Sequence, residues 1–138
     1  MTETHQPRGA VGILVNPSSG RDVRRLAARA QQQTLEAKRN QVARIAVGVA
    51  AAGARTVVVM RDPMRAATAA LEPIGVDLDV EILDVEACLR PSDTQEATRQ
   101  MRARGCGAIV VLGGDGTNRV IADVWPDAPL VPISTGTN

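Results

Sequence analysis

The stretch Ile109-Val110-Val111-Leu112-Gly113-Gly114-Asp115-Gly116-Thr117 joins an apolar run to a glycine-rich turn that carries one carboxylate and one hydroxyl. Glycines let a ligand approach the backbone closely, and a helix starting near Thr117 would point its free amides at the same ligand, which suits phosphate. Because Asp115 repels a bare phosphate, it suggests a metal ion, a sugar hydroxyl or a proton to be removed. We interpret the segment as a nucleotide-phosphate loop with a catalytic or metal-linked acid. The alternative is a tight strand-to-helix turn in which Asp115 caps the helix.

The composition is that of a soluble globular protein of about one domain. The chain has 138 residues, 44% hydrophobic and 22% charged. Trp125 is its only aromatic residue, so the core must be built from Val, Ile, Leu and Ala. A net charge of +1 and the lack of stacking aromatics argue against a nucleic-acid partner.

Several site classes are excluded by the residues the chain lacks. Lys38 is the only lysine, so no Walker-type loop ending in Gly-Lys-Ser/Thr is present. The only histidine, His5, lies in the polar N-terminal tail, which argues against a Ser-His-Asp triad or a histidine zinc site. Cys88 and Cys106 lack metal-ligand spacing, and reduced thiols are the default expectation. With no leader and no apolar run of membrane length, we expect a cytoplasmic protein without membrane insertion.

Strand and helix patterns alternate along the chain. After a flexible tail at 1–9, we expect strands at five apolar runs: Ala10–Val15, Arg55–Met60, Leu78–Leu83, Ala108–Leu112 and Leu130–Ile133. Helices are expected at 21–33, 35–52 with Thr34 as cap, 62–72 ahead of Pro73, 93–104 with a capping box from Ser92, and 118–124. Gly53 and Gly105 are placed to end two of them.

This alternation predicts an α/β fold: a three-layer Rossmann-like domain over residues 10–138 with a mainly parallel sheet of about five strands. In such sheets ligands bind beyond the carboxyl ends of the strands. Both glycine-bearing turns, Asn16–Gly20 and Gly113–Thr117, follow strand ends on that rim. A shared site is therefore a better interpretation than two separate turns, although Asn16 could also serve only to cap its own turn.

Three motifs in order carry a resemblance to a known superfamily. They are Asn16-Pro17-Ser18-Ser19-Gly20, the Gly113–Thr117 loop, and Pro132-Ile133-Ser134-Thr135-Gly136-Thr137-Asn138. The chain resembles the N-terminal domain of the superfamily of NAD kinases, diacylglycerol kinases and sphingosine kinases. Within it, the chain is most similar to the ATP-NAD-kinase-like proteins of acetoin catabolism.

The resemblance implies a role for each matched residue. Asp115 would be the acid that deprotonates or orients the attacking ribose 2′-hydroxyl of NAD, and a candidate Mg²⁺ ligand. Amides and a hydroxyl that hold the nucleotide phosphates would come from the second motif: Gly113, Gly114, Gly116 and Thr117. Further nucleotide contacts would come from the other motifs: Asn16, Ser19, Thr135, Gly136 and Asn138. Such enzymes transfer the γ-phosphoryl group of ATP with Mg²⁺, here to NAD to give NADP.

Departures from the family pattern keep other functions open. Asn118 stands where these kinases usually have an apolar residue, and Ser134 and Thr137 alter the diacylglycerol-kinase pattern. A lipid kinase-like domain is therefore a weaker alternative. A second alternative is a non-catalytic dinucleotide- or metabolite-sensing domain linked to acetoin catabolism. A third is an interaction or structural module that binds no ligand at the carboxyl ends of its strands.

The family's chains continue into a β-rich second domain that closes the cleft, and this sequence ends at Asn138. We therefore expect an N-terminal domain that lacks its C-terminal partner domain and is inactive alone. Apolar residues of the last strand, Leu130, Val131 and Ile133, would then favour self-association as a homo-oligomer.

Overall fold

The computed structural model describes residues 9–15, 28–61, 77–86 and 90–133. Its elements in chain order are β1 (Ala10–Val15), α1 (Ala28–Ala51), β2 (Thr56–Arg61), β3 (Asp79–Glu86), α3 (Pro91–Ala103), β4 (Cys106–Leu112), α4 (Asp115–Val124) and β5 (Leu130–Ile133). The helix expected at 62–72 lies outside the described residues, as does the start of the one expected at 21–33. Within the described chain, none of the helices has the length and apolar character needed to cross a membrane.

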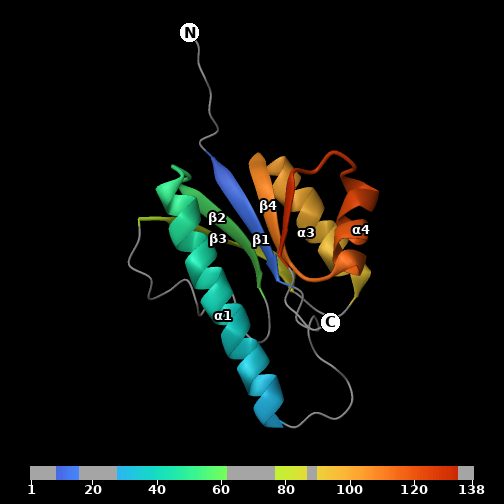
Figure 1. The fold of residues 1–138 in the computed structure, drawn as a ribbon. Helices are drawn as coiled ribbons and strands as arrows, with labels where there is room; N and C mark the ends of the chain where they lie inside the picture. The colour runs from blue at the N-terminus through green and yellow to red at the C-terminus, as the bar shows by residue number, and fades with distance from the viewer. Residues whose placement is uncertain (1–8, 16–27, 62–76, 87–89, 134–138) are drawn as a thin grey trace.

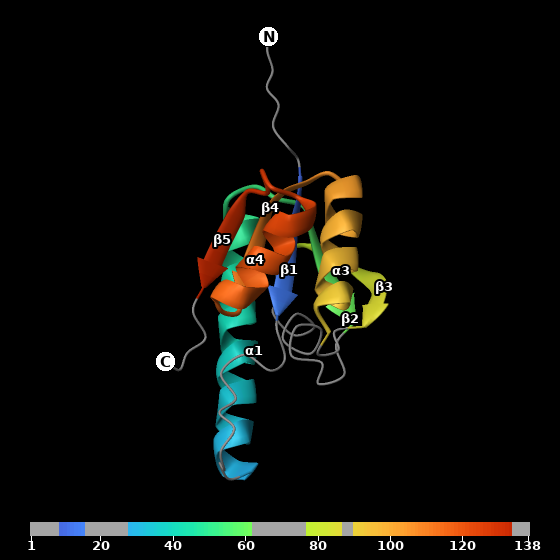
Figure 2. The same cartoon turned by 90° about the vertical axis from the view of Figure 1, so that its right-hand side faces the viewer.

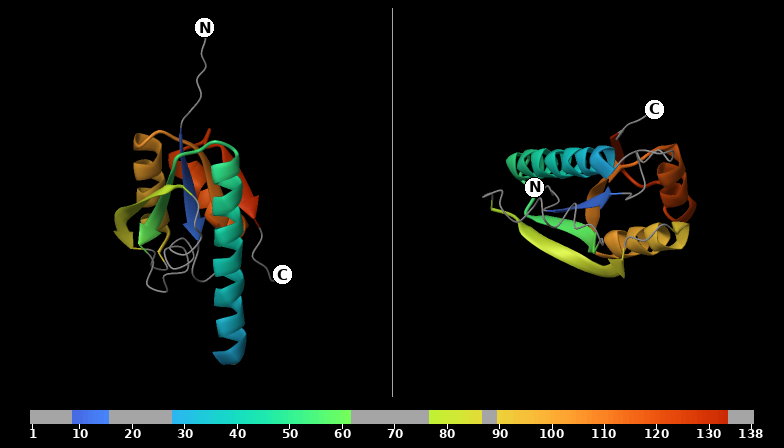
Figure 3. Two further views of the ribbon diagram at one scale, coloured as in Figure 1. Left: turned by 90° about the vertical axis from the view of Figure 1, so that its left-hand side faces the viewer. Right: turned by 90° about the horizontal axis from the view of Figure 1, so that it is seen from below.

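The five strands form one parallel sheet in the order β3-β2-β1-β4-β5. Figure 1 shows α1 on one face of the sheet, and Figure 2 shows α3 and α4 on the opposite face. Seen from below in Figure 3, the sheet lies between these two helical layers. The expected three-layer α/β architecture with five strands is confirmed.

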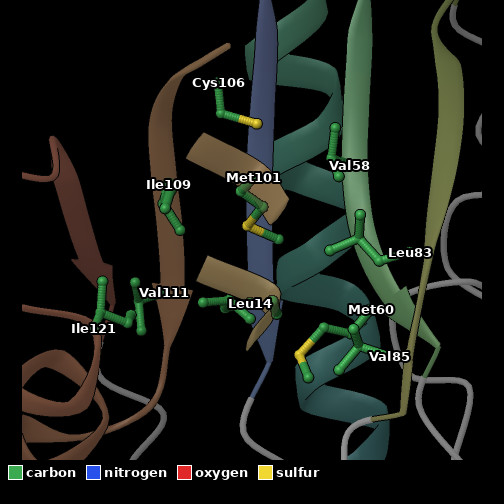
Figure 4. Close-up of a cluster of buried hydrophobic side chains, with 11 residues drawn as sticks. Leu14, Val58, Met60, Leu83, Val85, Met101, Cys106, Ile109, Val111 and Ile121 are labelled. Atoms are coloured by element: carbon green, nitrogen blue, oxygen red, sulfur yellow. The ribbon is translucent and has the colours of Figure 1, made fainter. Parts of the chain in front are cut away.

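Each face of the sheet carries its own apolar cluster. On the α1 face, Val42 and Ala46 of the helix pack with alternating residues of the strands, among them Val15, Val59 and Leu112. On the other face, α3 and α4 cover residues that Figure 4 shows around Met101. The largest fully buried side chains on that face come from three strands and two helices: Val58, Leu83, Met101, Ile109, Val111 and Ile121. As expected from the composition, aliphatic side chains build nearly all of this core.

Trp125 joins that second cluster from its border. It is partly buried, and the guanidinium of Arg102 lies 5.4 Å from the centre of its ring. The sole aromatic residue therefore serves packing in the described structure.

The helix beginnings differ from the sequence expectations. The chain does not break at Thr34, which lies inside the continuous helix α1 and is not a cap. A threonine inside a helix lowers helix stability by only a few tenths of a kcal/mol, so the strong helix-forming residues around Thr34 keep the helix continuous. Helix α3 begins at Pro91 after Arg90, and no side chain caps it. Ser92 therefore lies in the first turn, because proline at the first position is already set for a helix.

The helix ends agree with the sequence. Gly53 has φ 101° and Gly105 has φ 78°, the left-handed region that favours glycine. After α1, the N–H of Ala54 donates to the carbonyl of Val49 at 3.2 Å, which closes the last turn. Both glycines therefore turn the chain back toward the next strand, as predicted.

Candidate nucleotide site at the carboxyl ends of the strands

The three sequence motifs leave the sheet from three neighbouring positions. Val15 at the end of β1 is in register with Leu112 at the end of β4, and Leu112 is in register with Ile133 at the end of β5. The Gly113 N–H donates to the Ile133 carbonyl at 3.3 Å, which ties the second motif to the third. Because neighbouring strands lie about 4.8 Å apart, the three motifs begin within about 10 Å of one another. The expectation of a common rim is confirmed for the points where the motifs start.

The motif residues differ in how far the structure describes them. Gly113, Gly114, Asp115, Gly116 and Thr117 are described. The proposed contacts from the other two motifs lie outside the described residues: Asn16, Ser19, Thr135, Gly136 and Asn138.

The rim between β1 and β4 is the switch point of the sheet. The chain leaves β1 toward α1 on one face and leaves β4 toward α4 on the other, while β1 and β4 pair side by side. Connections that diverge in this way leave a crevice beyond the carboxyl ends of the two strands, where ligands of open α/β sheets bind. The glycine-rich loop after β4 therefore borders the expected ligand position.

Helix α4 begins earlier than the sequence indicated, at Asp115 and not at Asn118. Gly114 is the N-cap residue, with extended backbone, and no side chain caps the helix. Asp115 is exposed in the first turn, so its interpretation as the helix cap is wrong. An exposed carboxylate at the positive end of a helix is favourably placed, and it is accessible to a ligand on the rim.

The amides of the loop divide into two groups. The N–H of Gly113 is used by β5, and the N–H of Thr117 donates to the Gly114 carbonyl at 3.1 Å. A helix cannot satisfy the N–H groups of its own first residues, which applies to Asp115 and Gly116. Over the described chain, these two N–H groups and that of Gly114 have no protein acceptor. Three consecutive amides are therefore available to an anion at the start of α4.

Gly114 and Gly116 are not required by the fold. Neither has a positive φ, and no heavy atom of the described residues lies within 4 Å of a Cβ built on either one. Packing and backbone conformation would thus accept alanine at both positions. The remaining physical reason for glycine is open space above the free amides, which is what a bound phosphate needs.

Three buried side-chain atoms of the described chain have no hydrogen-bond partner, among them Oδ2 of Asp93, which lies 3.7 Å from Nε of Arg90. The other two belong to α4 and α1. One is Oδ1 of Asn118 in the first turn of α4, and the other is Nε of Arg39 in α1. Asn118 was noted from the sequence as a departure from the family. Arg39 was missed, because a helical pattern alone does not show which end of the sheet a residue overhangs.

The ionisable groups limit the chemistry of the site. Among the described residues, no three His, Cys, Asp or Glu side chains gather in a way that could hold a metal ion. Mg²⁺ commonly takes only one or two carboxylates and completes its shell with phosphate oxygens and water, so Asp115 with a bound nucleotide fits that pattern. Cys106 is a buried free thiol whose pKa burial raises to about 11, so it is not a nucleophile at neutral pH.

Comparison with known proteins agrees with this geometry. The model of the ATP-NAD kinase N-terminal domain matches residues 11–138, which include all three motifs. Acetoin catabolism protein X of Cupriavidus necator is 38% identical over 135 residues, covering 93% of this chain and 38% of that protein. This chain thus spans little more than a third of that relative's length, and no solved structure matches significantly. The chain belongs to the family of ATP-NAD kinase N-terminal domains.

Proposed function

We propose that residues 10–138 form the nucleotide-binding domain of an NAD-kinase-like phosphotransferase. The observation that carries this proposal is the pair of glycines, Gly114 and Gly116, that the fold does not require beside three amides without an acceptor. Phosphates of ATP or NAD would accept hydrogen bonds from those amides at the positive end of α4. Thr117 and the residues of the other two motifs would complete the contacts: Asn16, Ser19, Thr135, Gly136 and Asn138.

In the transfer reaction, Asp115 would receive the proton of the acceptor hydroxyl, for which NAD ribose 2′-OH is the proposed source. A bond forms between the acceptor oxygen and the γ-phosphorus as the bond to the leaving ADP oxygen breaks. Bound Mg²⁺ would neutralise charge on the β- and γ-phosphates. The loop amides hold the phosphate chain while the exposed carboxylate of Asp115 faces the acceptor. Because this step needs both reactants held in line, we propose it for a protein in which further chain closes the cleft.

The test separates ligand binding from folding. Gly116→Ala should raise the free energy of unfolding by about 0.5–1 kcal/mol, because alanine suits a helical position better than glycine. The same change should weaken ATP and NAD binding at least tenfold, because the methyl group fills the space of a phosphate. Gly48→Ala is the matched control, since Gly48 lies in α1 and a Cβ there also meets nothing within 4 Å. It should stabilise the protein equally and leave nucleotide affinity unchanged.

Isothermal titration calorimetry with ATP, NAD and NADH, beside urea denaturation, measures both quantities. If the folded wild-type protein binds none of the three below millimolar concentrations, the proposal is wrong and an interaction module remains. If Gly116→Ala binds as tightly as the wild type, the glycine-rich loop is not the phosphate site.

The name of the relative, which refers to acetoin catabolism and not to a kinase, supports a second candidate function. In this case the domain binds a dinucleotide or metabolite as a sensor and transfers no phosphoryl group. The two candidates differ in turnover: a kinase converts NAD and ATP to NADP and ADP in a coupled assay. Nucleotide binding without any NADP, in a protein as long as the relative, would favour the sensor.

A further inference from the structure

Arg39 stands on the sheet-facing side of α1, close to the rim where the motifs begin. It precedes Val42 by three positions, and Val42 and Ala46 are buried against the sheet. Residues three and four apart share one face of a helix, so Arg39 continues this stripe. Because α1 runs opposite to the strands and extends past their carboxyl ends in Figures 1 and 2, Arg39 lies about one turn nearer the rim than Val42.

The guanidinium of Arg39 lacks the partners that other arginines have. Its Nε is buried and makes no hydrogen bond within the described chain. Four described arginines, by contrast, pair with carboxylates: Arg61, Arg90, Arg99 and Arg104. A buried donor without an acceptor costs stability, and native proteins rarely retain one without a use for it. The unsatisfied Nε therefore points to an acceptor that the described residues do not supply.

The position of Arg39 indicates what that acceptor is. Helix α1 covers one face of the sheet and α4 the other, so these two helices flank the crevice expected at the switch point. The α4 side offers amides and the carboxylate of Asp115, but the glycine-rich loop contains no cation. A phosphate chain in that crevice needs positive charge, and a guanidinium fork suits phosphate oxygens. The long stem of Arg39 would carry its fork from the α1 side over the ends of β1 and β4.

We propose that Arg39 binds the phosphate chain of the ligand opposite the amides of α4. This inference rests on the proposed function for the location of the nucleotide. The ligand chemistry is a polyphosphate, which either the triphosphate of ATP or the pyrophosphate of NAD can supply. The two sources are separated by titrating each nucleotide.

A phosphate-binding role gives a signature that a purely structural role would not. Arg39→Met keeps an apolar stem of similar length and removes the unsatisfied donor, so the melting temperature of the ligand-free protein should rise. The same variant should bind inorganic tripolyphosphate and the preferred nucleotide about ten- to a hundredfold more weakly, as expected for a lost hydrogen bond to a charged group. Arg39→Lys should fall between, because an ammonium keeps the charge without the fork.

The experiment titrates tripolyphosphate, ATP and NAD into the wild type, Arg39→Met, Arg39→Gln and Arg39→Lys, with circular dichroism to confirm folding. Arg44→Met is the control, because Arg44 is exposed on the same helix. It should bind all ligands within twofold of the wild type. Any folded Met or Gln variant of Arg39 that binds within twofold of the wild type overturns the inference and leaves the proposed function standing.

Two further results are decisive. If the wild type binds tripolyphosphate through Arg39 but neither nucleotide, the anion site is supported and the proposed function is wrong. If the wild type binds none of the three, both are overturned. Should Arg39→Met and Arg39→Gln fail to fold, a folded Arg39→Lys decides: weaker binding supports the inference, and unchanged binding with an unchanged salt dependence overturns it.

Discussion

Gly12 in the central strand β1 is where the structure sets the sharpest packing limit. A Cβ on Gly12 would lie 2.5 Å from Sδ of Met101 and 3.2 Å from its Cγ and Cε, well inside the usual contact distance of about 3.5–4.0 Å. Met101 is fully buried and lies across β1 between Ile109 and Val58 in Figure 4, so it has little room to move. Gly12→Ala should therefore overpack this cluster.

The expected cost combines two opposing effects. Overpacking a core by one methyl group costs about 1–3 kcal/mol, and replacing glycine inside a strand returns about 0.5–1 kcal/mol. We expect Gly12→Ala to lower the free energy of unfolding by about 0.5–2 kcal/mol, which corresponds to roughly 2–8 °C in melting temperature. Urea denaturation followed by the fluorescence of Trp125, the only tryptophan, measures this change and reports on the same cluster.

A double-mutant cycle tests the cause. Met101→Ala alone should cost about 2–5 kcal/mol, because it leaves a cavity above β1. Combined with Gly12→Ala, the loss should be at least about 1 kcal/mol smaller than the sum of the two, since the new methyl group enters the vacated space. Additive losses, or a Gly12→Ala protein as stable as the wild type, would show that Met101 is not the obstacle and that the close approach of α3 to β1 has been misjudged.

The remaining predictions concern chemistry, pH and the sheet edge. Asp115→Asn should keep ATP affinity but reduce phosphoryl transfer about 10²–10⁴-fold in a protein as long as the relative, whereas Asp123→Asn at an exposed position of α4 should change neither. Burial raises the pKa of Cys106 from 9.0 to about 11, so the unfolded chain loses this proton first. The contribution of Cys106 to the free energy of unfolding should be intact below pH 9 and should fall by up to about 1.4 kcal/mol per pH unit toward pH 11. Denaturation curves measure this loss, and the Cys106→Ala variant should not show it. Strand β5 lies at the edge of the sheet, where Pro132 offers no N–H to a second chain, so Pro132→Val should increase self-association. Light scattering measures the mass of the particles in both proteins. Equal masses would exclude this edge as a route to oligomers.

The sheet was predictable because each strand has a clear hydrophobic signature. The run Val57-Val58-Val59 is fully buried on both faces, which is typical of an inner parallel strand. The alternation in β3 indicated a strand whose acidic residues form a wetter side, but Val80 and Ile82 are themselves 41% and 50% exposed, and the buried residues of this strand are Leu83 and Val85.

Helix starts were less predictable because several residue types can occupy the first turn. Ser92 and Gln95 match a capping box, but Pro91 sets the start two residues earlier and leaves Arg90 as the cap residue. Likewise, Asp115 is suited to either the cap or the first turn, and only the extended backbone of Gly114 decides between them. For α3 and α4, local patterns therefore place the helix correctly but miss its first residue by two and three positions, whereas the break expected at Thr34 does not exist.

The loop residues of the candidate site could be named from the sequence, but the physical reason for each residue type could not be predicted. Glycines look alike in a sequence, and only the structure shows that a Cβ on Gly12 would meet a side chain while one on Gly116 would meet none. The same limit applies to Arg39, whose significance depends on a buried Nε and on the end of the sheet that α1 overhangs.

The switch point makes ligand binding depend on the central strand pair. The α1 side and the α4 side of the crevice meet at β1 and β4, whose register runs from Val11 and Ala108 to Val15 and Leu112. A phosphate held by Arg39 on one side and by the α4 amides on the other would bridge two helices on opposite faces of the sheet. Such a ligand binds only when that strand pair is formed, so its binding energy adds to the stability of the whole sheet and not only of the loop. Ligand should therefore protect amides of β1 and β4 from hydrogen exchange as strongly as it protects those of α4.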